Sequence, residues 1–452
     1  MLSRTGYLIP KSDWTDQDKK SLTVRPVVNE EYGVRPPAFR VYRTSKNNVC
    51  VPQHYKISKN CPDKRPTPVP SRSKFTGKLR DSTSQNEAHD KVVKALKIIG
   101  GGILSLPCGY GKTTVALAVA STMKVRTMIV VHKEFLANQW RERIKQFCPG
   151  ATIGIIQQNK FDVDCDYVIA MLQTLSMKEF TLDQFESIGM VIVDEAHHIC
   201  ARVFSQAFFK FCPKYTLGLS ATPIRKDGLT DVLYWFLGPP AFSVERENRQ
   251  TTIVKTLRYK CDEYKLPPPV TRFGKVSLVQ MITDLIENHG RNNFIEKQVR
   301  KIMKNPSRRL LILSDRRHHC EEIAQRLSDI GTGLYMGGMK EADLEESSKQ
   351  KIIVGTFSQA HEGLDIPVLD TVLLATPKSD VKQAVGRILR ETTGKKNDPI
   401  ILDVVDDWGL MGSMYYKRRK MYKQSGFEIE IEKDKEPEET LKLTGYVFLD
   451  DD

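Results

Sequence analysis

The feature that most constrains this chain is a glycine-containing turn between a short apolar run and a helix-forming segment. The apolar run covers residues 101–106, and the helix-forming segment covers residues 112–123. The turn between them consists of Pro107, Cys108, Gly109, Tyr110 and Gly111. Because glycine has no Cβ, the backbone N–H groups of such a turn can curl around phosphate oxygens, and the helix start adds positive dipole. The pattern predicts a buried strand, a phosphate-binding loop and a helix, which together form a unit of an α/β fold.

The residues after the turn carry the chemistry expected of a nucleotide site. Lys112 would reach the β and γ phosphates of ATP, and Thr113 would place its hydroxyl on Mg²⁺, with Thr114 beside it. The common pattern G-x-x-x-x-G-K-[ST] has glycine at the position that Leu106 occupies here. A strand-to-helix junction without a ligand is the structural alternative. We predict ATP and Mg²⁺ as the cofactors.

An acidic pair further along the chain supports the nucleotide site. Residues 189–193 form a continuous apolar run typical of a central parallel strand, and Asp194 and Glu195 follow at its carboxyl end. Ligands of open α/β sheets bind at that edge. Asp194 would hold Mg²⁺ through water, and Glu195 would orient the attacking water. Two solvated acids at the start of a loop are the alternative interpretation.

A third segment supplies positive charge. Arg387 and Arg390 lie three residues apart on a predicted helix, so both guanidinium groups project from one face, and Gln383 lies one turn earlier. When two lobes close on ATP, these arginines would stabilise the charge that develops on the γ phosphoryl group. Such an effect accelerates comparable reactions by about 10³ to 10⁵. The alternative is a pair of solvent-facing arginines.

Length and composition indicate two lobes and an accessory region. A chain of 452 residues exceeds one ordinary core. Residues 78–245 and 306–427 each alternate short apolar runs with helical patterns, which predicts an α/β fold with two tandem parallel-sheet lobes. The predicted parts are an N-terminal accessory region at 1–77, a first lobe at 78–245, an inter-lobe connection at 246–305, a second lobe at 306–427 and an acidic tail at 428–452. In the accessory region, residues 39–44 are its clearest strand and residues 62–74 read as a linker.

Charge and cysteine usage fit a protein that binds nucleic acid in a reducing compartment. The formal net charge is +14, as expected of a protein that contacts phosphate backbones. The nine cysteines include no C-x-x-C pair, so neither a disulfide framework nor a zinc ribbon is indicated. No apolar stretch of about 18 residues occurs, so we expect a soluble protein without membrane partners.

Five ordered segments resemble motifs I, II, III, V and VI of superfamily 2 helicases. They are Gly111-Lys112-Thr113, Asp194-Glu195-Ala196-His197, Ser220-Ala221-Thr222-Pro223, Glu362-Gly363-Leu364-Asp365 and residues 383–390. The residues before Lys112 and the segment 220–228 most resemble the XPB-like branch, whose members act on DNA. Short strings at 22–26, 39–42 and 51–52 are similar to the leader of helicases from large nucleocytoplasmic DNA viruses, of the poxvirus transcript-release type. A small structural cap on the first lobe is the alternative for these strings.

The resemblance implies two RecA-like lobes and roles for further residues. Gln85 would contact adenine, with a surface glutamine as the alternative. Gly363 and Asp365 would face the nucleotide and its sugar. Contacts to the backbone of one strand are implied for Lys133, Gln173, Thr174 and Thr356. Coupling between nucleotide and strand is implied for Ser220, Ala221, Thr222 and His197. Val131-His132-Lys133 and Gln139-Trp140 resemble motif Ia, and Trp140 is more typical of a core position than of base stacking.

The predicted function is an ATP-dependent helicase or translocase that moves 3′ to 5′ on DNA in viral transcription or another DNA transaction. Three alternatives remain open: a duplex-DNA translocase that remodels polymerase complexes without unwinding, an RNA helicase, and an ATP-gated clamp. The expected partners are single-stranded or tailed duplex DNA, with RNA, an RNA–DNA hybrid and RNA polymerase as further candidates. We expect the protein in the cytoplasm, in a viral factory, or in the virion, with the nucleus as an alternative. The oligomeric state is not predicted.

Overall fold

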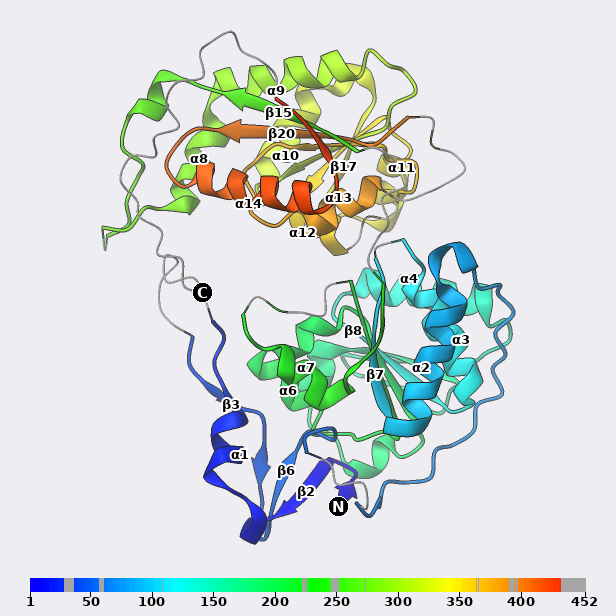
Figure 1. Cartoon of the computed structure of the whole chain (residues 1–452). Helices are drawn as coiled ribbons and strands as arrows, with labels where there is room; N and C mark the ends of the chain where they lie inside the picture. Colours follow the sequence, from blue (N-terminus) through cyan, green and yellow to red (C-terminus); the bar gives the residue numbers. More distant parts are fainter. Residues whose placement is uncertain are drawn as a thin grey trace. The chain divides into compact units, whose positions relative to one another are not determined.

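The chain forms two compact units, Met1–Glu247 and Asn248–Asp452, each with its own sheet and hydrophobic cores (Figure 1). The computed structural model describes residues 1–27, 36–56, 61–107, 109–221, 225, 227–244, 252–272, 274–362, 364, 366–389, 395 and 397–431. The predicted α/β fold with two parallel-sheet lobes is confirmed.

The first unit contains an eight-stranded sheet in the order β10-β9-β11-β8-β12-β13-β7-β14. Its strands are β7 (Gly101–Ser105), β8 (Thr127–Val131), β9 (Ile153–Gln157), β10 (Lys160–Phe161), β11 (Tyr167–Met171), β12 (Met190–Val193), β13 (Tyr215–Ser220) and β14 (Pro240–Ser243). Every neighbouring pair is parallel except β9 and β10. Parallel strands are typically buried on both faces. In β8, Met128 and Val130 accordingly enter one core and Ile129 and Val131 the other.

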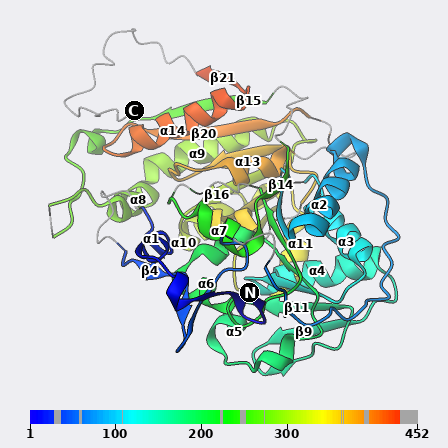
Figure 2. The ribbon, with the colours of Figure 1, turned by 60° about the horizontal axis from the view of Figure 1, so that its bottom comes forward.

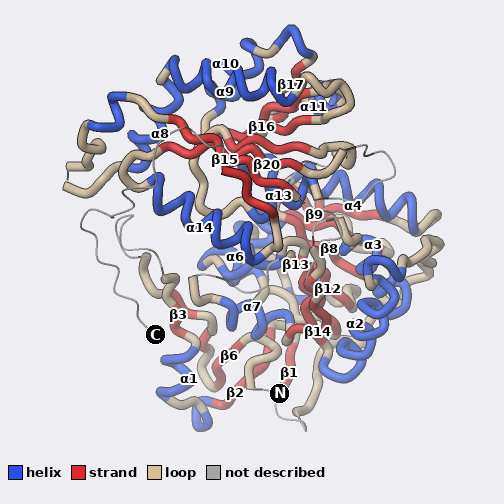
Figure 3. The backbone as a smooth tube through the Cα atoms, turned by 45° about the horizontal axis from the view of Figure 1, so that its top comes forward, coloured by secondary structure: helices blue, strands red, loops and turns tan. Residues whose placement is uncertain are grey.

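Helices cover both faces of this sheet (Figure 3). Helices α2 (Gln85–Ile99), α3 (Lys112–Met123) and α4 (Glu134–Phe147) pack on one face, and α5 (Leu172–Met177), α6 (Arg202–Ala207) and α7 (Thr230–Leu237) on the other. Short 3-10 turns occur at Asp81–Thr83, Leu182–Phe185 and Ala196–Cys200. The helix predicted at residues 112–123 is confirmed by α3.

The N-terminal region belongs to the first unit and packs beside α6 and α7 (Figure 2). It contains β1 (Leu2–Ser3), β2 (Gly6–Pro10), a 3-10 turn (Lys11–Asp13), α1 (Asp16–Ser21), β3 (Thr23–Val24), β4 (Phe39–Arg40), β5 (Arg43–Thr44) and β6 (Asn48–Val51). The single strand predicted at 39–44 is wrong, because β4 pairs with β3 whereas β5 pairs with β6. The chain changes partner at Val41, which is fully buried and donates its N–H to the carbonyl of Leu22.

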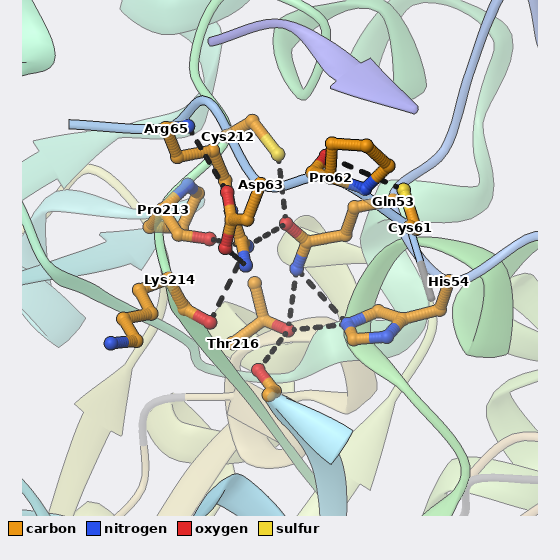
Figure 4. A network of polar contacts seen from close by, with 11 residues as sticks. Gln53, His54, Cys61, Pro62, Asp63, Arg65, Cys212, Pro213, Lys214 and Thr216 are labelled. Carbon is orange, nitrogen blue, oxygen red and sulfur yellow. Dashed lines mark hydrogen bonds and ion pairs between the residues drawn. The ribbon is translucent and has the colours of Figure 1, made fainter. Parts of the chain in front are cut away.

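A polar network ties this region to the start of β13 (Figure 4). Gln53 donates to the hydroxyl of Thr216 at 2.9 Å, and His54 Nε2 lies 3.0 Å from the same hydroxyl. Arg65 donates to the carbonyl of Pro213 at 2.7 Å. Burial and the charge of Arg65 lower the pKa of His54 to about 4, so the imidazole is neutral. The segment predicted as a linker therefore starts with residues anchored on the lobe.

The second unit contains a seven-stranded parallel sheet in the order β17-β18-β16-β19-β20-β15-β21. Its strands are β15 (Ile253–Tyr259), β16 (Leu310–Ser314), β17 (Thr332–Tyr335), β18 (Ile352–Thr356), β19 (Thr371–Leu374), β20 (Ile400–Asp406) and β21 (Glu428–Ile431). Its helices are α8 (Leu278–Glu287), α9 (His289–Ile302), α10 (Arg317–Arg326), α11 (Glu341–Ser348), α12 (Phe357–Glu362), α13 (Lys382–Ile388) and α14 (Met411–Gln424), with 3-10 turns at Asp262–Lys265 and Ser328–Ile330. Two cores, one on each face, hold alternate residues of β16.

Two predicted boundaries need correction. The segment 246–305 was expected to join the lobes, but β15 lies inside the second sheet and pairs with β20 over seven residues. The acidic tail was expected to begin at residue 428, but residues 428–431 form β21, the edge strand beside β15. Lys255, Thr256 and Arg258 interrupt the apolar residues of β15, so its sequence does not read as the continuous apolar run of a buried strand.

None of the helices in the described ranges is both long enough and apolar enough to cross a membrane. The cysteines in the same ranges are free thiols.

Candidate functional site

Four predicted motif segments leave the first sheet at one edge. They follow β7, β8, β12 and β13, which are consecutive in the sheet in the order β8-β12-β13-β7. The register pairs Val193 with Val130 and Ser220 with Ser105. Because these strands are parallel, their carboxyl ends meet at the same edge, where α/β sheets bind ligands. The fold therefore gathers segments that lie far apart in the sequence.

The phosphate loop has the backbone that its glycines predicted. Gly109 and Gly111 have φ values of 87° and 80°, and α3 begins directly after them at Lys112. The ammonium of Lys112 donates to the carbonyl of Leu106 at 3.1 Å, which folds the side chain back over the loop. Lys112 and Thr113 are half-buried, so both remain accessible to a ligand. Cys108 lies outside the described residues.

Gln85 forms hydrogen bonds that support the phosphate loop. Its amide donates to the carbonyl of Tyr110 at 2.8 Å and accepts from the N–H of Arg80 at 3.0 Å. Only 1% of Gln85 is exposed, so the alternative of a surface glutamine is wrong. A Cβ added at Gly111 would lie 2.5 Å from the Gln85 amide nitrogen, which explains the need for glycine there. The contact of Gln85 with adenine remains a prediction.

The carboxylate of Asp194 is held by two donors. The N–H of Glu195 donates to one oxygen at 3.0 Å, and the indole N–H of Trp140 donates to the other at 2.8 Å. Burial and the neighbouring charge of Glu195 raise the pKa of Asp194, whereas the indole and the ammonium of Lys112 act in the opposite direction. The phosphate loop follows β7 and Asp194 follows β12, and only β13 separates these two parallel strands, so both segments lie at the same edge of the sheet.

The donor set fits a hard divalent cation. Glu195 adopts a left-handed backbone with φ of 45°, which turns its side chain at the end of β12. Its Oε2 atom is buried and has no hydrogen-bond partner within the described part of the chain, although His197 Nδ1 lies 3.5 Å away. Two adjacent, half-buried carboxylates favour a cation, and carboxylate and hydroxyl oxygens suit Mg²⁺. Asp194 and Thr113 are the residues that would hold it.

Three histidine rings connect the acidic segment to the predicted strand contacts. The His198 ring lies 3.9 Å from that of His132 and 4.4 Å from that of His197. Exposed Gln173 donates to the carbonyl of His132 at 2.6 Å. A continuous path therefore runs from Gln173 through the histidines to Glu195.

The other predicted strand contacts in the first unit lie near this path. Lys133 is half-buried and forms the N-cap of α4. The hydroxyl of Thr174 accepts from the N–H of Gln158 at 3.1 Å, so one of its hydrogen bonds is used within the protein.

The loop after β13 reaches the acidic segment through residues that the sequence analysis did not assign a role. Arg225 donates to the carbonyl of His197 and forms an ion pair with Asp227. Ser220 is fully buried at the end of β13, Ala221 is half-buried, and Thr222 lies outside the described residues. The spacing of Arg225 and His197 in the sequence gave no signal of this contact, because only the adjacency of their loops creates it.

In the second unit, the predicted residues follow β18 and occupy α13. The hydroxyl of Thr356 accepts from the N–H of Gln359 at 3.4 Å. Gln383 and Arg387 are both half-buried and lie four residues apart on α13, and Arg387 donates to the carbonyl of Ala360 at 2.8 Å. Gly363, Asp365 and Arg390 lie outside the described residues. Helix α13 ends at Ile388, so the shared helical face proposed for Arg387 and Arg390 stays a prediction.

Comparisons with known proteins agree with these observations. A family model described as the res subunit of type III restriction enzymes matches residues 78–225. A candidate ATP-dependent RNA helicase of Acanthamoeba polyphaga mimivirus is 34% identical over 426 residues, covering 90% of this chain and 81% of that protein. A candidate helicase of Invertebrate iridescent virus 6 is 30% identical over 387 residues, covering 78% of this chain and 83% of that protein. A fragment of a candidate type I restriction enzyme HsdR subunit from Vibrio vulnificus has a similar fold, with a TM-score of 0.57 and 16% identity over 79% of this chain and 69% of that one.

The two lobes, the phosphate loop and the acidic segment define an ATP-dependent helicase of superfamily 2, with tandem RecA-like lobes. Within that class, the chain belongs to the helicase family of these mimivirus and iridescent virus proteins.

Proposed function

We propose that this helicase is a DNA-stimulated motor that moves 3′ to 5′ along one strand during viral transcription or another viral DNA transaction. The choice of DNA as substrate rests on the XPB-like sequence around Lys112 and in the segment 220–228. The net charge of +14 supports a polynucleotide substrate without choosing between DNA and RNA. The viral relatives support a place in the infected cytoplasm or the virion, with RNA polymerase as a candidate partner.

The observation that carries the proposal is the contact path from Gln173 to Glu195. Gln173 donates to the carbonyl of His132, whose ring contacts that of His198, and the His198 ring contacts that of His197 beside Glu195. A strand bound at Gln173 and Lys133 would therefore bias the position of the carboxylate that orients the attacking water. Such a path makes hydrolysis dependent on polynucleotide.

Different residues of the first unit would have different roles in ATP hydrolysis. Lys112 would bind the β and γ phosphates, and the N–H groups of the loop would hold the phosphate oxygens. Glu195 would orient the water for attack in line with the leaving group. Thr113 and Asp194 would hold Mg²⁺, which would neutralise phosphate charge when bound. From the second unit, Arg387 is proposed, by family resemblance, to stabilise the charge of the transition state.

The deciding experiment measures ATPase rate with no polynucleotide, single-stranded DNA, duplex DNA and RNA, in wild type, Lys112→Ala and Arg387→Ala. We expect strong stimulation by DNA that both substitutions abolish. Stimulation by RNA alone would replace the DNA assignment with the RNA helicase that the name of the mimivirus relative suggests. Absence of hydrolysis under every condition would leave the ATP-gated clamp.

Strand-displacement assays then separate unwinding from translocation. We expect duplexes with a 3′ tail to be unwound and those with a 5′ tail to remain intact. Stimulation by duplex without unwinding of either substrate would instead indicate a translocase that remodels polymerase complexes.

A further inference from the structure

We infer that Trp140 is a positioning residue, which fixes the Mg²⁺-binding carboxylate of Asp194 and links it to the helix that begins at the predicted strand contact Lys133. The link to Lys133 rests on the proposed function, whereas the contact between Trp140 and Asp194 does not. Nothing in the sequence motifs assigns this role, because a tryptophan at that helical position is ordinarily a core residue.

The contact itself is a hydrogen bond between the buried indole of Trp140 and the half-buried carboxylate of Asp194. The indole N–H of Trp140 lies 2.8 Å from Asp194 Oδ2, and only 1% of Trp140 is exposed. Asp194 Oδ1 accepts from the N–H of Glu195 at 3.0 Å, so each carboxylate oxygen has one donor. A carboxylate with both oxygens held in this way keeps one rotamer and retains further lone pairs for a cation.

The position of Trp140 on α4 connects this bond to the strand-binding surface. Helix α4 spans Glu134–Phe147 and has Lys133 as its N-cap, so Trp140 lies seven residues, or about two turns, further along one rigid element. The preceding strand β8 pairs with β12, which leads into Asp194. A displacement of α4 by a bound strand would therefore move the indole relative to the carboxylate.

Core packing is the competing explanation, since Trp140 also belongs to a hydrophobic core with Leu136 and Ile144. The two explanations differ in their dependence on Mg²⁺. A residue that only fills the core would affect nucleotide binding equally with and without the cation. A residue that orients Asp194 would affect it only when the cation is present.

The test uses Trp140→Phe, which keeps an aromatic ring and removes the N–H donor. Trp235→Phe, at a tryptophan on α7 in the same unit, serves as the matched control. Binding of a fluorescent, non-hydrolysable ATP analogue is titrated with Mg²⁺ and repeated in EDTA. We expect Trp140→Phe to need about 10-fold more Mg²⁺ for half-maximal binding, which is the usual loss when an outer partner of a metal ligand is removed. In EDTA it should match wild type, and Trp235→Phe should match wild type throughout.

The ATPase of the same variants tests the link to the strand. We expect single-stranded DNA to stimulate Trp140→Phe much less than Trp235→Phe. An unchanged Mg²⁺ dependence would overturn the positioning role. A shifted Mg²⁺ dependence with full DNA stimulation would overturn the link to Lys133. A wild type that no polynucleotide stimulates would contradict the proposed function, while the Mg²⁺ titration would still decide the role of Trp140.

Trp140 fluorescence provides a second measurement that keeps the residue in place. The chain has four tryptophans, so replacing Trp14, Trp235 and Trp408 with phenylalanine leaves Trp140 as the sole indole. Its emission should shift when Mg²⁺ and the nucleotide analogue are added together, and remain constant with the analogue alone. An identical response to both additions would overturn the inference even where Trp140→Phe does not fold.

Discussion

At the scale of single residues, the phosphate loop depends on a partner outside its motif. Gln85 bonds the backbone on two sides, at Tyr110 in the loop and at Arg80 before α2. Buried polar groups of this kind are costly to leave unpaired. Gln85 therefore has two possible contributions to ATP binding: support of the loop, which any nucleoside triphosphate would share, and recognition of adenine, which only ATP would show.

Replacing Gln85 separates these contributions. Gln85→Ala removes both hydrogen bonds and should weaken ATP binding by roughly 10-fold, as expected for a loss of 1 to 2 kcal/mol. Binding of fluorescent ATP and GTP analogues measures the effect. Equal losses for the two analogues would assign Gln85 to loop support, and loss of the preference for ATP would assign it to adenine recognition. Unchanged binding of both would refute either role. Asn86→Ala, at the next, exposed position on α2, is the control.

At the scale of elements, α14 shows that a basic sequence need not be a binding surface. The run 414–420 is rich in Lys and Arg, yet Arg418 is 1% exposed and forms a bidentate ion pair with Asp403 of β20 at 2.9 Å. Arg418 also donates to the carbonyl of Lys378 at 2.9 Å, and the hydroxyl of Tyr422 donates to Asp403 at 3.0 Å. This buried cluster fixes α14 on the second sheet.

Breaking that pair should destabilise the second unit. Arg418→Met leaves the buried carboxylate of Asp403 without its cation, and such losses cost about 3 to 5 kcal/mol. Thermal unfolding followed by circular dichroism should show the decrease. Lys420→Met, at an exposed position of the same helix, should have little effect. Asp403→Leu added to Arg418→Met should restore part of the stability, because no unpaired charge then remains. Equal unfolding temperatures for Arg418→Met and Lys420→Met would contradict the prediction.

At the scale of the whole molecule, folding keeps His54 neutral in the first unit and His319 neutral in the second. His54 anchors the N-terminal region on the first unit, and burial with the charge of Arg65 lowers its pKa to about 4. In the second unit, His319 is fully buried between Ser314 and Asn292, at 3.0 and 3.1 Å. Burial and the charge of Arg291 lower the pKa of His319 to about 3.

Both shifts predict loss of stability in mild acid. The ordinary histidine pKa is about 6.5, so below that pH the unfolded chain binds protons that the folded chain does not. Stability is therefore complete above about pH 6.5 and falls toward pH 4. Between pH 6.5 and 5, each histidine should cost its unit about 2 kcal/mol. Urea unfolding at several pH values measures this loss of stability. It is carried out on wild type and on the double variant His54→Gln, His319→Gln.

In the double variant, the free energy of unfolding should decrease much less between pH 6.5 and pH 4 than in wild type. His289→Gln, at an exposed position of α9, should retain the wild-type pH dependence. A double variant with a pH profile identical to wild type would show that other groups cause any acid instability.

The apolar strands could be predicted because they are buried on both faces. In β16, β18 and β19, nearly every residue is apolar, so the sequence reads as a continuous run. β15 could not be found in this way, since Lys255 and Arg258 interrupt its apolar residues. Its place in the sheet is decided by β20 and β21, which pair with it from distant parts of the chain.

The sequence by itself determined the strand-loop-helix unit at Lys112, the acidic pair after β12 and the two-lobed α/β class, because these depend on local patterns of glycine, charge and apolar residues. The tertiary structure alone decided that Trp140 holds Asp194, that Gln85 supports the phosphate loop and that Arg225 meets His197. Each of these contacts joins residues from different elements. Their geometry arises from the order and register of the parallel strands, which no local pattern in the sequence encodes.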